Sequence, residues 1–97
     1  MGRSIGRPKM HAVISAIAKV AGETGAAIRD MRGGALRRLA AWIGWHEGLV
    51  TLRTIAASLR LRSEGHVSGL IARCERQFGF DPTLLDHLDG ALALLRV

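Results

Sequence analysis

The chain has 97 residues, 48% of them hydrophobic, which predicts one small packed domain and excludes both two domains and a chain disordered throughout. Fourteen basic side chains, twelve of them arginine, outnumber eight acidic ones, and the net charge of +6 indicates a polyanion, above all nucleic acid, as the partner. The lack of tyrosine excludes tyrosine-dependent catalysis, and the single cysteine, Cys74, excludes an internal disulfide and a cysteine-rich zinc site. With no secretory segment and no apolar run of about 18 residues, we expect a cytoplasmic protein without a membrane partner.

The charge is unevenly distributed along the chain. Residues 1–79 carry thirteen basic and five acidic side chains, whereas residues 80–97 carry Arg96 against three aspartates. We therefore expect the surface that faces a polyanion to belong to the first four-fifths of the chain, and the last segment to have another role.

Residues 1–9 are rich in glycine and basic side chains without any period, and this predicts a flexible basic arm. Pro8 suits the first turn of a helix, and apolar residues at helical spacing continue that helix to residue 21. Gly22 and Gly25 end the pattern, with one extra helical turn expected over 24–30.

A second strong helix is predicted near 35–47, where Leu36, Leu39 and Ile43 share one stripe. Arg37 and Arg38 lie beside this stripe. The same predicted helix holds two tryptophans. Trp42 borders the stripe and is expected in the core, whereas Trp45 points largely away.

Three further helices follow in chain order. Thr51 is an N-cap for a short helix over 52–60, and Ser63 is an N-cap for a helix over 64–78. Asp81 and Pro82 form the N-cap and first turn of a final helix, about 82–95. Because no segment alternates with a period of two, the predicted fold class is all-α: residues 10–97 form a compact bundle of about five helices.

Residues 51–78 have the pattern of a helix-turn-helix, in which two short helices are joined by about three residues. Ala56 is the small residue expected at their crossing, and Leu59 and Leu61 are expected to fill the turn. Val67 and Leu70, with Ile71, would hold the second helix against the first.

The opposite face of the second helix is small, polar or basic. Its residues are Gly65, His66, Gly69, Ala72, Arg73 and Arg76. Each glycine inside a helix costs about 1 kcal/mol relative to alanine, so its presence calls for an explanation. Either the backbone approaches an outside surface such as DNA, or the glycines make room for a neighbouring helix, and the sequence leaves both explanations open.

Arginines accompany this pattern. Between Glu47 and Glu64 the only charged side chains are Arg53, Arg60 and Arg62, and arginine pairs well with phosphate and with guanine. The free N–H groups at the start of the second helix offer a further phosphate contact. The candidate DNA-contacting residues are Arg37, Arg38, Arg53, Arg60, Arg62, Ser63, Gly65, His66, Gly69 and Arg73.

The stretch from about His11 to Arg76 resembles the C-terminal DNA-binding domain of DnaA-type replication initiators and the related domain of some REP-associated transposases. The first matching segment is Leu36-Arg37-Arg38-Leu39-Ala40-Ala41-Trp42-Ile43. The second is Thr51-Leu52-Arg53-Thr54-Ile55-Ala56-Ala57-Ser58-Leu59, and the segment Asp81-Pro82-Thr83-Leu84-Leu85 is similar to the closing segment of many transposase-associated copies. At the start of the recognition helix, Ser63-Glu64-Gly65-His66 stands where the initiators have Asp-His-Thr/Ser-Thr.

This resemblance implies a double-stranded DNA-binding module, bacterial in type and either free-standing or part of a longer transposase-like or initiator-like protein. The chain has no Walker motif and no tyrosine, so the resemblance implies neither ATP-dependent initiation nor transposase catalysis. We therefore expect no enzymatic activity, no small-molecule substrate and no cofactor.

Other constellations are weaker. The four histidines are scattered over separate helices without metal-ligand spacing, so no metal is expected, and Cys74 falls on an apolar helix face, where a buried thiol is typical. The alternative function is protein interaction through the leucine-lined last helix. Self-association through that helix would give a homodimer that suits two half-sites on DNA.

Overall fold

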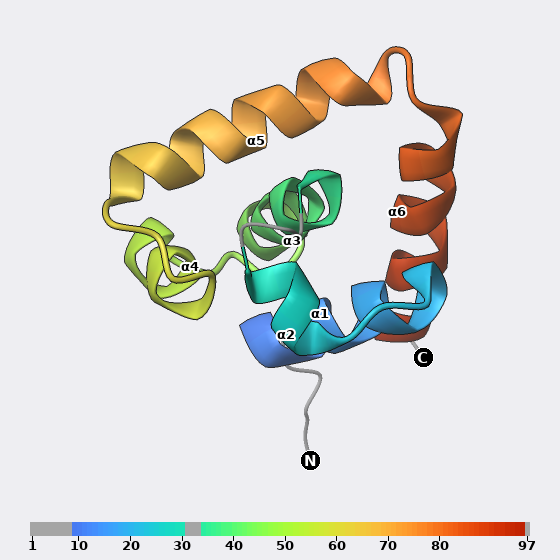
Figure 1. The fold of residues 1–97 in the computed structure, drawn as a ribbon, viewed down its shortest axis with the longest axis horizontal. Helices are drawn as coiled ribbons and strands as arrows, with labels where there is room; N and C mark the ends of the chain where they lie inside the picture. The colour runs from blue at the N-terminus through green and yellow to red at the C-terminus, as the bar shows by residue number, and fades with distance from the viewer. Residues whose placement is uncertain (1–8, 31–33, 97) are drawn as a thin grey trace.

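The structure, a computed structural model, describes residues 9–30 and 34–96 (Figure 1). Within these ranges the chain forms six helices and no strand, which confirms the predicted all-α class. The helices are α1 (Met10–Ala21), α2 (Gly25–Arg29), α3 (Ala35–His46), α4 (Leu52–Ser58), α5 (Glu64–Phe78) and α6 (Pro82–Leu95). The extra turn expected after the first helix is α2. No helix of the described ranges has the length and apolar character needed to cross a membrane.

The helix starts follow the capping residues of the sequence. The hydroxyl of Thr51 accepts a hydrogen bond from the N–H of Thr54 (3.2 Å), and that of Ser63 accepts one from the N–H of His66 (3.4 Å). The Asp81 carboxylate caps α6 in the same way, with Pro82 in the first turn. These local bonds satisfy N–H groups that a helix leaves unpaired, and they confirm the three predicted N-caps.

Two predicted boundaries were wrong. Helix α1 begins at Met10 with Lys9 as its N-cap, two residues later than the start predicted at Pro8. The predicted arm, apart from Lys9, lies outside the described residues. Helix α4 ends at Ser58 instead of residue 60, so five residues, 59–63, connect it to α5 where about three were predicted.

The early end of α4 has a backbone cause. The N–H of Leu61 donates to the carbonyl of Ala56 (2.8 Å), and the N–H of Arg60 donates to that of Ala57 (3.3 Å). This pair of bonds is a Schellman motif, and it places Arg60 in the left-handed region, with φ +57°. Glycine is the usual residue at this position, and its absence hid the helix end from sequence analysis.

Helix α3 lies in the middle of the molecule, with α5 on one side, α1 and α2 on the other, and α4 and α6 at the two ends (Figure 1). Its side chains Leu39 and Ile43 are fully buried, as are Ile17 of α1, Ile55 of α4 and Val67 of α5. One continuous core therefore joins all of these helices. Leu70 was predicted to be buried with Ile55 and Val67, but it is only half-buried.

The first and last helices pack most extensively against each other. Gly90 of α6 lies so close to α1 that an added Cβ would be 3.0 Å from Cγ1 of Val20. A second close contact occurs at Gly44 of α3, where a Cβ would be 2.5 Å from the sulfur of the buried Met10. Both glycines permit close approach between neighbouring helices.

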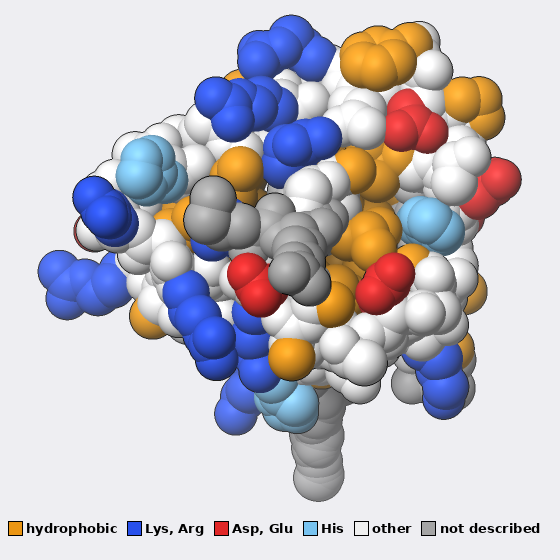
Figure 2. Space-filling model, in the orientation of Figure 1, with side chains coloured by type: hydrophobic (Ala, Val, Ile, Leu, Met, Phe, Trp, Pro, Cys, Tyr) orange, Lys and Arg blue, Asp and Glu red, His pale blue; other side chains and the backbone are white. Residues whose placement is uncertain are grey.

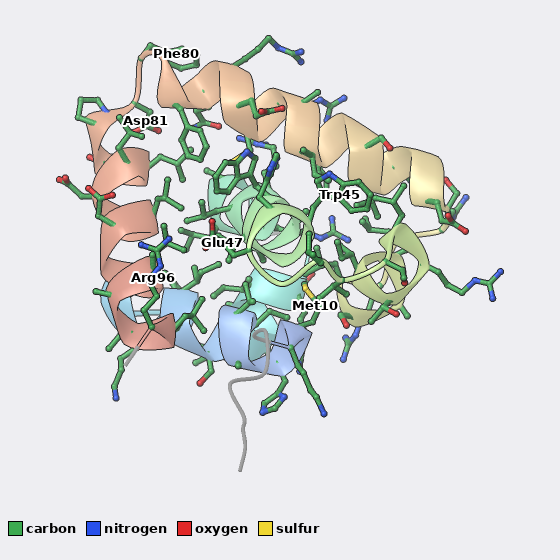
Figure 3. The ribbon with its side chains drawn as sticks, turned by 180° about the vertical axis from the view of Figure 1, so that it is seen from behind. Met10, Trp45, Glu47, Phe80, Asp81 and Arg96 are labelled. Carbon is green, nitrogen blue, oxygen red and sulfur yellow. The ribbon has the colours of Figure 1, made fainter. Side chains whose placement is uncertain are left out.

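A chain of polar contacts connects α3, α5 and α6. Nη2 of Arg38 donates to Oε1 of Gln77 (2.8 Å), whose amide donates to Oδ2 of Asp81 (2.8 Å). The other oxygen of Asp81 accepts the N–H of Leu84 (3.1 Å). The side-chain hydrogen bond from Gln77 and the backbone bond from Leu84 lower the pKa of Asp81. Figure 3 places Asp81 at the corner between α5 and α6.

Of the two tryptophans, Trp45 points away as predicted, whereas Trp42, predicted in the core, is only partly buried against it. Trp42 is half-buried and packs edge-on against Phe78, with ring centroids 5.2 Å apart. Trp45 is 41% exposed. Figure 3 shows both the exposed Trp45 and the ion pair in which Arg96 of the last turn contacts Glu47 (3.1 Å).

Candidate nucleic-acid interface

Helix α4 lies at one end of the molecule and packs against α5, which runs from there to the corner with α6. Ala56 of α4 is buried, and Leu59 at the start of the turn is fully buried. Leu61 follows in the turn and is half-buried. Apolar side chains therefore pack under the turn and against the core, and the charged side chains of this region are left on its surface.

The side chain of Arg37 on α3 holds the turn between α4 and α5 by a hydrogen bond. Its Nη2 donates to the carbonyl oxygen of Leu59 (2.7 Å), across 22 residues of sequence. The Nε of the same side chain is buried and has no hydrogen-bond partner in the described part of the chain. Arg37 was predicted only as a DNA contact, and its role as a tether of the turn had no local sequence signal.

Four of the predicted arginines lie on these elements: Arg53 on α4, Arg60 and Arg62 in the turn, and Arg73 on α5. All four are exposed, and none of their guanidinium groups has a hydrogen bond or ion pair with another described residue. In Figure 2 basic side chains gather over α4 and along α5, and acidic ones lie mostly toward α6. The positive charge of these arginines is therefore left uncompensated by the fold.

The outward face of α5 is open. A Cβ added at Gly69 would meet no atom within 4 Å, and one at Gly65 would meet only the hydroxyl of Ser63, at 3.7 Å. Neither glycine makes room for a neighbouring helix, so the second of the two explanations left by the sequence does not apply within the described chain. Arg76 is also exposed on this helix.

The N-terminus of α5 is less available to a phosphate than the sequence analysis predicted. Ser63 uses its hydroxyl to cap the helix, and its side-chain oxygen is thereby engaged with the N–H of His66. Glu64 occupies the first turn and is exposed. An anion approaching the helix N-terminus would meet this carboxylate, so the arginines of the turn are the stronger attraction.

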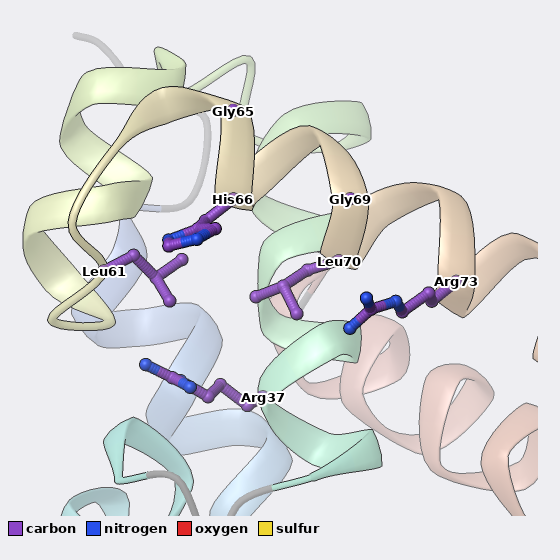
Figure 4. Close-up of a pocket in the computed structure, with 7 residues that line it drawn as sticks. All are labelled: Arg37, Leu61, Gly65, His66, Gly69, Leu70 and Arg73. Carbon is purple, nitrogen blue, oxygen red and sulfur yellow. The ribbon is translucent and has the colours of Figure 1, made fainter.

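A hollow of about 390 Å³ lies between α5, the turn and α3; we call it the α3–α5 hollow (Figure 4). Its lining residues are Arg37, Leu61, Gly65, His66, Gly69, Leu70 and Arg73. The structure thus brings five of the predicted contact residues into one surface depression. Leu61 and Leu70 are additions, because they were predicted only to pack within the helix-turn-helix.

The remaining predicted residue, Arg38, lies apart from this hollow. It is half-buried, and its guanidinium is directed to Gln77 near the C-terminal end of α5. A contact with an outside partner would have to compete with this bond. The spacing of Arg37 and Arg38 in one helix gave no indication that they reach opposite ends of α5.

The described residues contain no group of three or more His, Cys, Asp or Glu side chains arranged to hold a metal ion. Cys74 is buried, and burial raises the pKa of its thiol to about 12. A thiol with so high a pKa stays protonated at neutral pH and is a poor nucleophile.

The leucine-lined face of α6 turns mainly toward the domain itself. Leu84 is buried, and Leu88, Leu92 and Leu95 pack partly buried against the core. The large apolar side chains left exposed on or next to this helix are Phe80 at the corner (75%), Leu85 (38%) and Leu94 (40%). Figure 3 shows Phe80 projecting from the corner between α5 and α6.

Comparison with known proteins found no matching family model, no matching curated protein and no matching solved structure.

Proposed function

We propose that the chain is a non-catalytic, sequence-recognising module for double-stranded DNA, in which α4, the turn and α5 act as a helix-turn-helix. The observation that carries this proposal is the set of four exposed arginines without acidic partners around the open face of α5. Exposed arginines supply the phosphate contacts on which duplex affinity depends, and a small-residue face lets the helix backbone come close to base edges.

The backbone at Arg60 supports a functional role for that side chain. A left-handed residue other than glycine costs about 1 kcal/mol, yet arginine stands at φ +57°. A residue kept at a disfavoured backbone position is a candidate for function. The resemblance of the sequence to DNA-binding domains of replication initiators and transposases agrees with this proposal and suggests the bacterial setting.

The test is the salt dependence of duplex binding. Replacing Arg60 and Arg62 by alanine should weaken binding to all duplexes and reduce the slope of log affinity against log salt by about 2, one unit for each lost phosphate contact. The control is a Lys19→Ala, Arg29→Ala double variant, which removes the same charge from α1 and α2. If both double variants show the same slope of log affinity against log salt, Arg60 and Arg62 do not contact the duplex.

A second candidate function is protein interaction at the corner between α5 and α6. The exposed Phe80 (75%) and Leu85 (38%) favour it, because exposed apolar surface contributes to protein–protein interfaces. If the chain fails to bind mixed-sequence duplex at low salt and sediments as a dimer that Phe80→Ser dissociates, interaction replaces DNA binding as the function.

A further inference from the structure

The α3–α5 hollow carries basic side chains and no acidic one. Arg37, His66 and Arg73 line it, and none of its seven lining residues is Asp or Glu. In Figure 4 the side chains of Arg37 and Arg73 approach it from different helices, with His66 on the side of the turn. A site with this composition selects an anion.

Arg37 lacks the counter-charge that a half-buried guanidinium normally has. Its one hydrogen bond within the described residues goes to the neutral carbonyl of Leu59, and its Nε is buried without a partner. A charge withdrawn from water without an ionic partner is costly, so an anion bound beside it would recover part of that cost. The bond to Leu59 also holds the guanidinium in a fixed position before any ligand arrives.

The second guanidinium is more accessible. Arg73 is exposed and has no partner in the described chain, so its donors are available without breaking any bond of the fold. Two guanidiniums, one fixed and one adjustable, suit an anion with several acceptor oxygens.

The size and the apolar part of the hollow narrow the choice of anion. Its volume of about 390 Å³ greatly exceeds the share of a single water, about 30 Å³. Leu61 and Leu70 supply an apolar surface beside the basic groups, and a Cβ added at Gly69 would meet no atom within 4 Å. A small free anion would leave this apolar surface without contacts, whereas a sugar–phosphate unit has both an anionic and an apolar part.

We propose that the α3–α5 hollow binds one backbone phosphate of duplex DNA between Arg37 and Arg73, with the adjoining deoxyribose against Leu61 and Leu70. This inference rests on the proposed DNA-binding function and adds to it a positioning contact, which fixes the register of α5 on the duplex without reading a base. It also gives Arg37 a double role, because the same side chain holds the turn and the phosphate.

The test compares two variants of the full chain that lose one exposed arginine each. Arg73→Gln removes a lining residue of the hollow, and Arg76→Gln removes the same charge one turn further along α5, outside the hollow. On one duplex at fixed salt we expect affinity to fall about tenfold for R73Q and about twofold for R76Q, because loss of a two-arginine contact exceeds loss of general attraction.

Methylphosphonate substitution then locates the contact. Neutralising the phosphates of the duplex one at a time should reveal a position that weakens binding of the unaltered chain about tenfold, weakens R76Q equally, and has little further effect on R73Q. Circular dichroism and thermal melts of both variants confirm that the fold is kept.

The outcomes separate this inference from the proposed function. If the unaltered chain binds duplex with a steep salt dependence, but R73Q and R76Q lose equal affinity and no phosphate position is coupled to Arg73, the phosphate site is wrong and DNA binding stands. If the unaltered chain shows no duplex binding at low salt, the proposed function and the phosphate site fail together.

Discussion

Gly44 and Gly90 lie inside helix contacts, whereas Gly65 and Gly69 face open space. The first two belong to the part of the molecule where α3 and α6 pack against α1, and there a missing Cβ lets helices come together. The other two belong to the outward face of α5, where a missing Cβ brings nothing within the chain closer. The same residue thus serves the fold in one region and leaves a surface open in the other, and only the three-dimensional arrangement distinguishes the two uses.

The same contrast extends to the arginines. Arg38 and Arg96 are engaged with Gln77 and Glu47, respectively, and contribute to contacts between helices. The guanidinium groups of Arg60 and Arg62 in the turn have no hydrogen bond or ion pair with the described chain. Arginines that hold helices together and exposed arginines whose side chains have no such bond therefore lie in different parts of a domain that has one continuous core.

The strongest test of the contrast is made on α5 itself, at two neighbouring residues. Val67 is fully buried and Ser68 is exposed. Val67→Asp places an unpaired charge in the core and should destabilise the fold by more than about 3 kcal/mol, enough to unfold a small domain. Ser68→Asp should leave the thermal melt nearly unchanged. A folded V67D variant would mean that α5 does not pack on α4 and α3 as described.

The glycines give the next largest effect, with opposite signs. Gly44→Ala should lower the free energy of unfolding by about 1–3 kcal/mol, because the added methyl overlaps the buried sulfur of Met10. Gly69→Ala should raise it by up to about 1 kcal/mol, because alanine is the better helix former and meets no atom. Chemical denaturation of both variants measures their free energies of unfolding. Equal changes of the same sign would contradict the contrast between the buried Gly44 and the open Gly69.

Gly69→Ala also bears on function. If the open face of α5 approaches DNA, the variant that is more stable should bind duplex more weakly, since its methyl projects into the α3–α5 hollow. Gly65→Ala, at the start of the same helix, is the matched variant. If Gly69→Ala and Gly65→Ala both bind duplex with unchanged affinity, Gly65 and Gly69 do not take part in DNA binding.

The smallest effect concerns the corner between α5 and α6. Because hydrogen bonds from Gln77 and Leu84 lower the pKa of Asp81, the ionised form stabilises the fold. This contribution is complete above the pKa of an unfolded aspartate, about 3.9, and is lost as the pH falls through the lower pKa of the folded state. Asp81→Asn should therefore reduce the melting temperature slightly at neutral pH, and the difference should vanish in acid.

Asp81→Ala serves as the control for this experiment, because it removes the cap of α6 as well as the charge. Its melting temperature should lie below that of the asparagine variant at neutral pH. A difference between the unaltered chain and Asp81→Asn that grows on acidification would contradict the assigned pKa shift.

The elements that the sequence predicted correctly are those with local causes. Apolar spacing produced the helices, and Thr51, Ser63 and Asp81 were recognised because an N-cap bonds to an N–H only three residues away. The end of α4 was missed because arginine, instead of glycine, occupies the left-handed position at residue 60.

The candidate site was predictable in its composition but not in its arrangement. One face of α5 lacks large apolar residues, and this pattern predicted that Gly65, Gly69 and Arg73 lie on the surface. The bond from Arg37 to Leu59 and that from Arg38 to Gln77 join residues 22 and 39 positions apart, and no periodicity connects such pairs. For the same reason the sequence left the two explanations of the glycines undecided.

The packing of α1 against α6 has a consequence for folding kinetics. The most extensive helix pair of the domain joins its first and last helices, so this contact forms only when almost the whole described chain closes into one loop. Helical proteins usually fold fast because their contacts are local. Here a long-range pairing completes the core, and we expect slower folding than for a bundle of sequential hairpins, with α1 exposing its apolar face until α6 has docked.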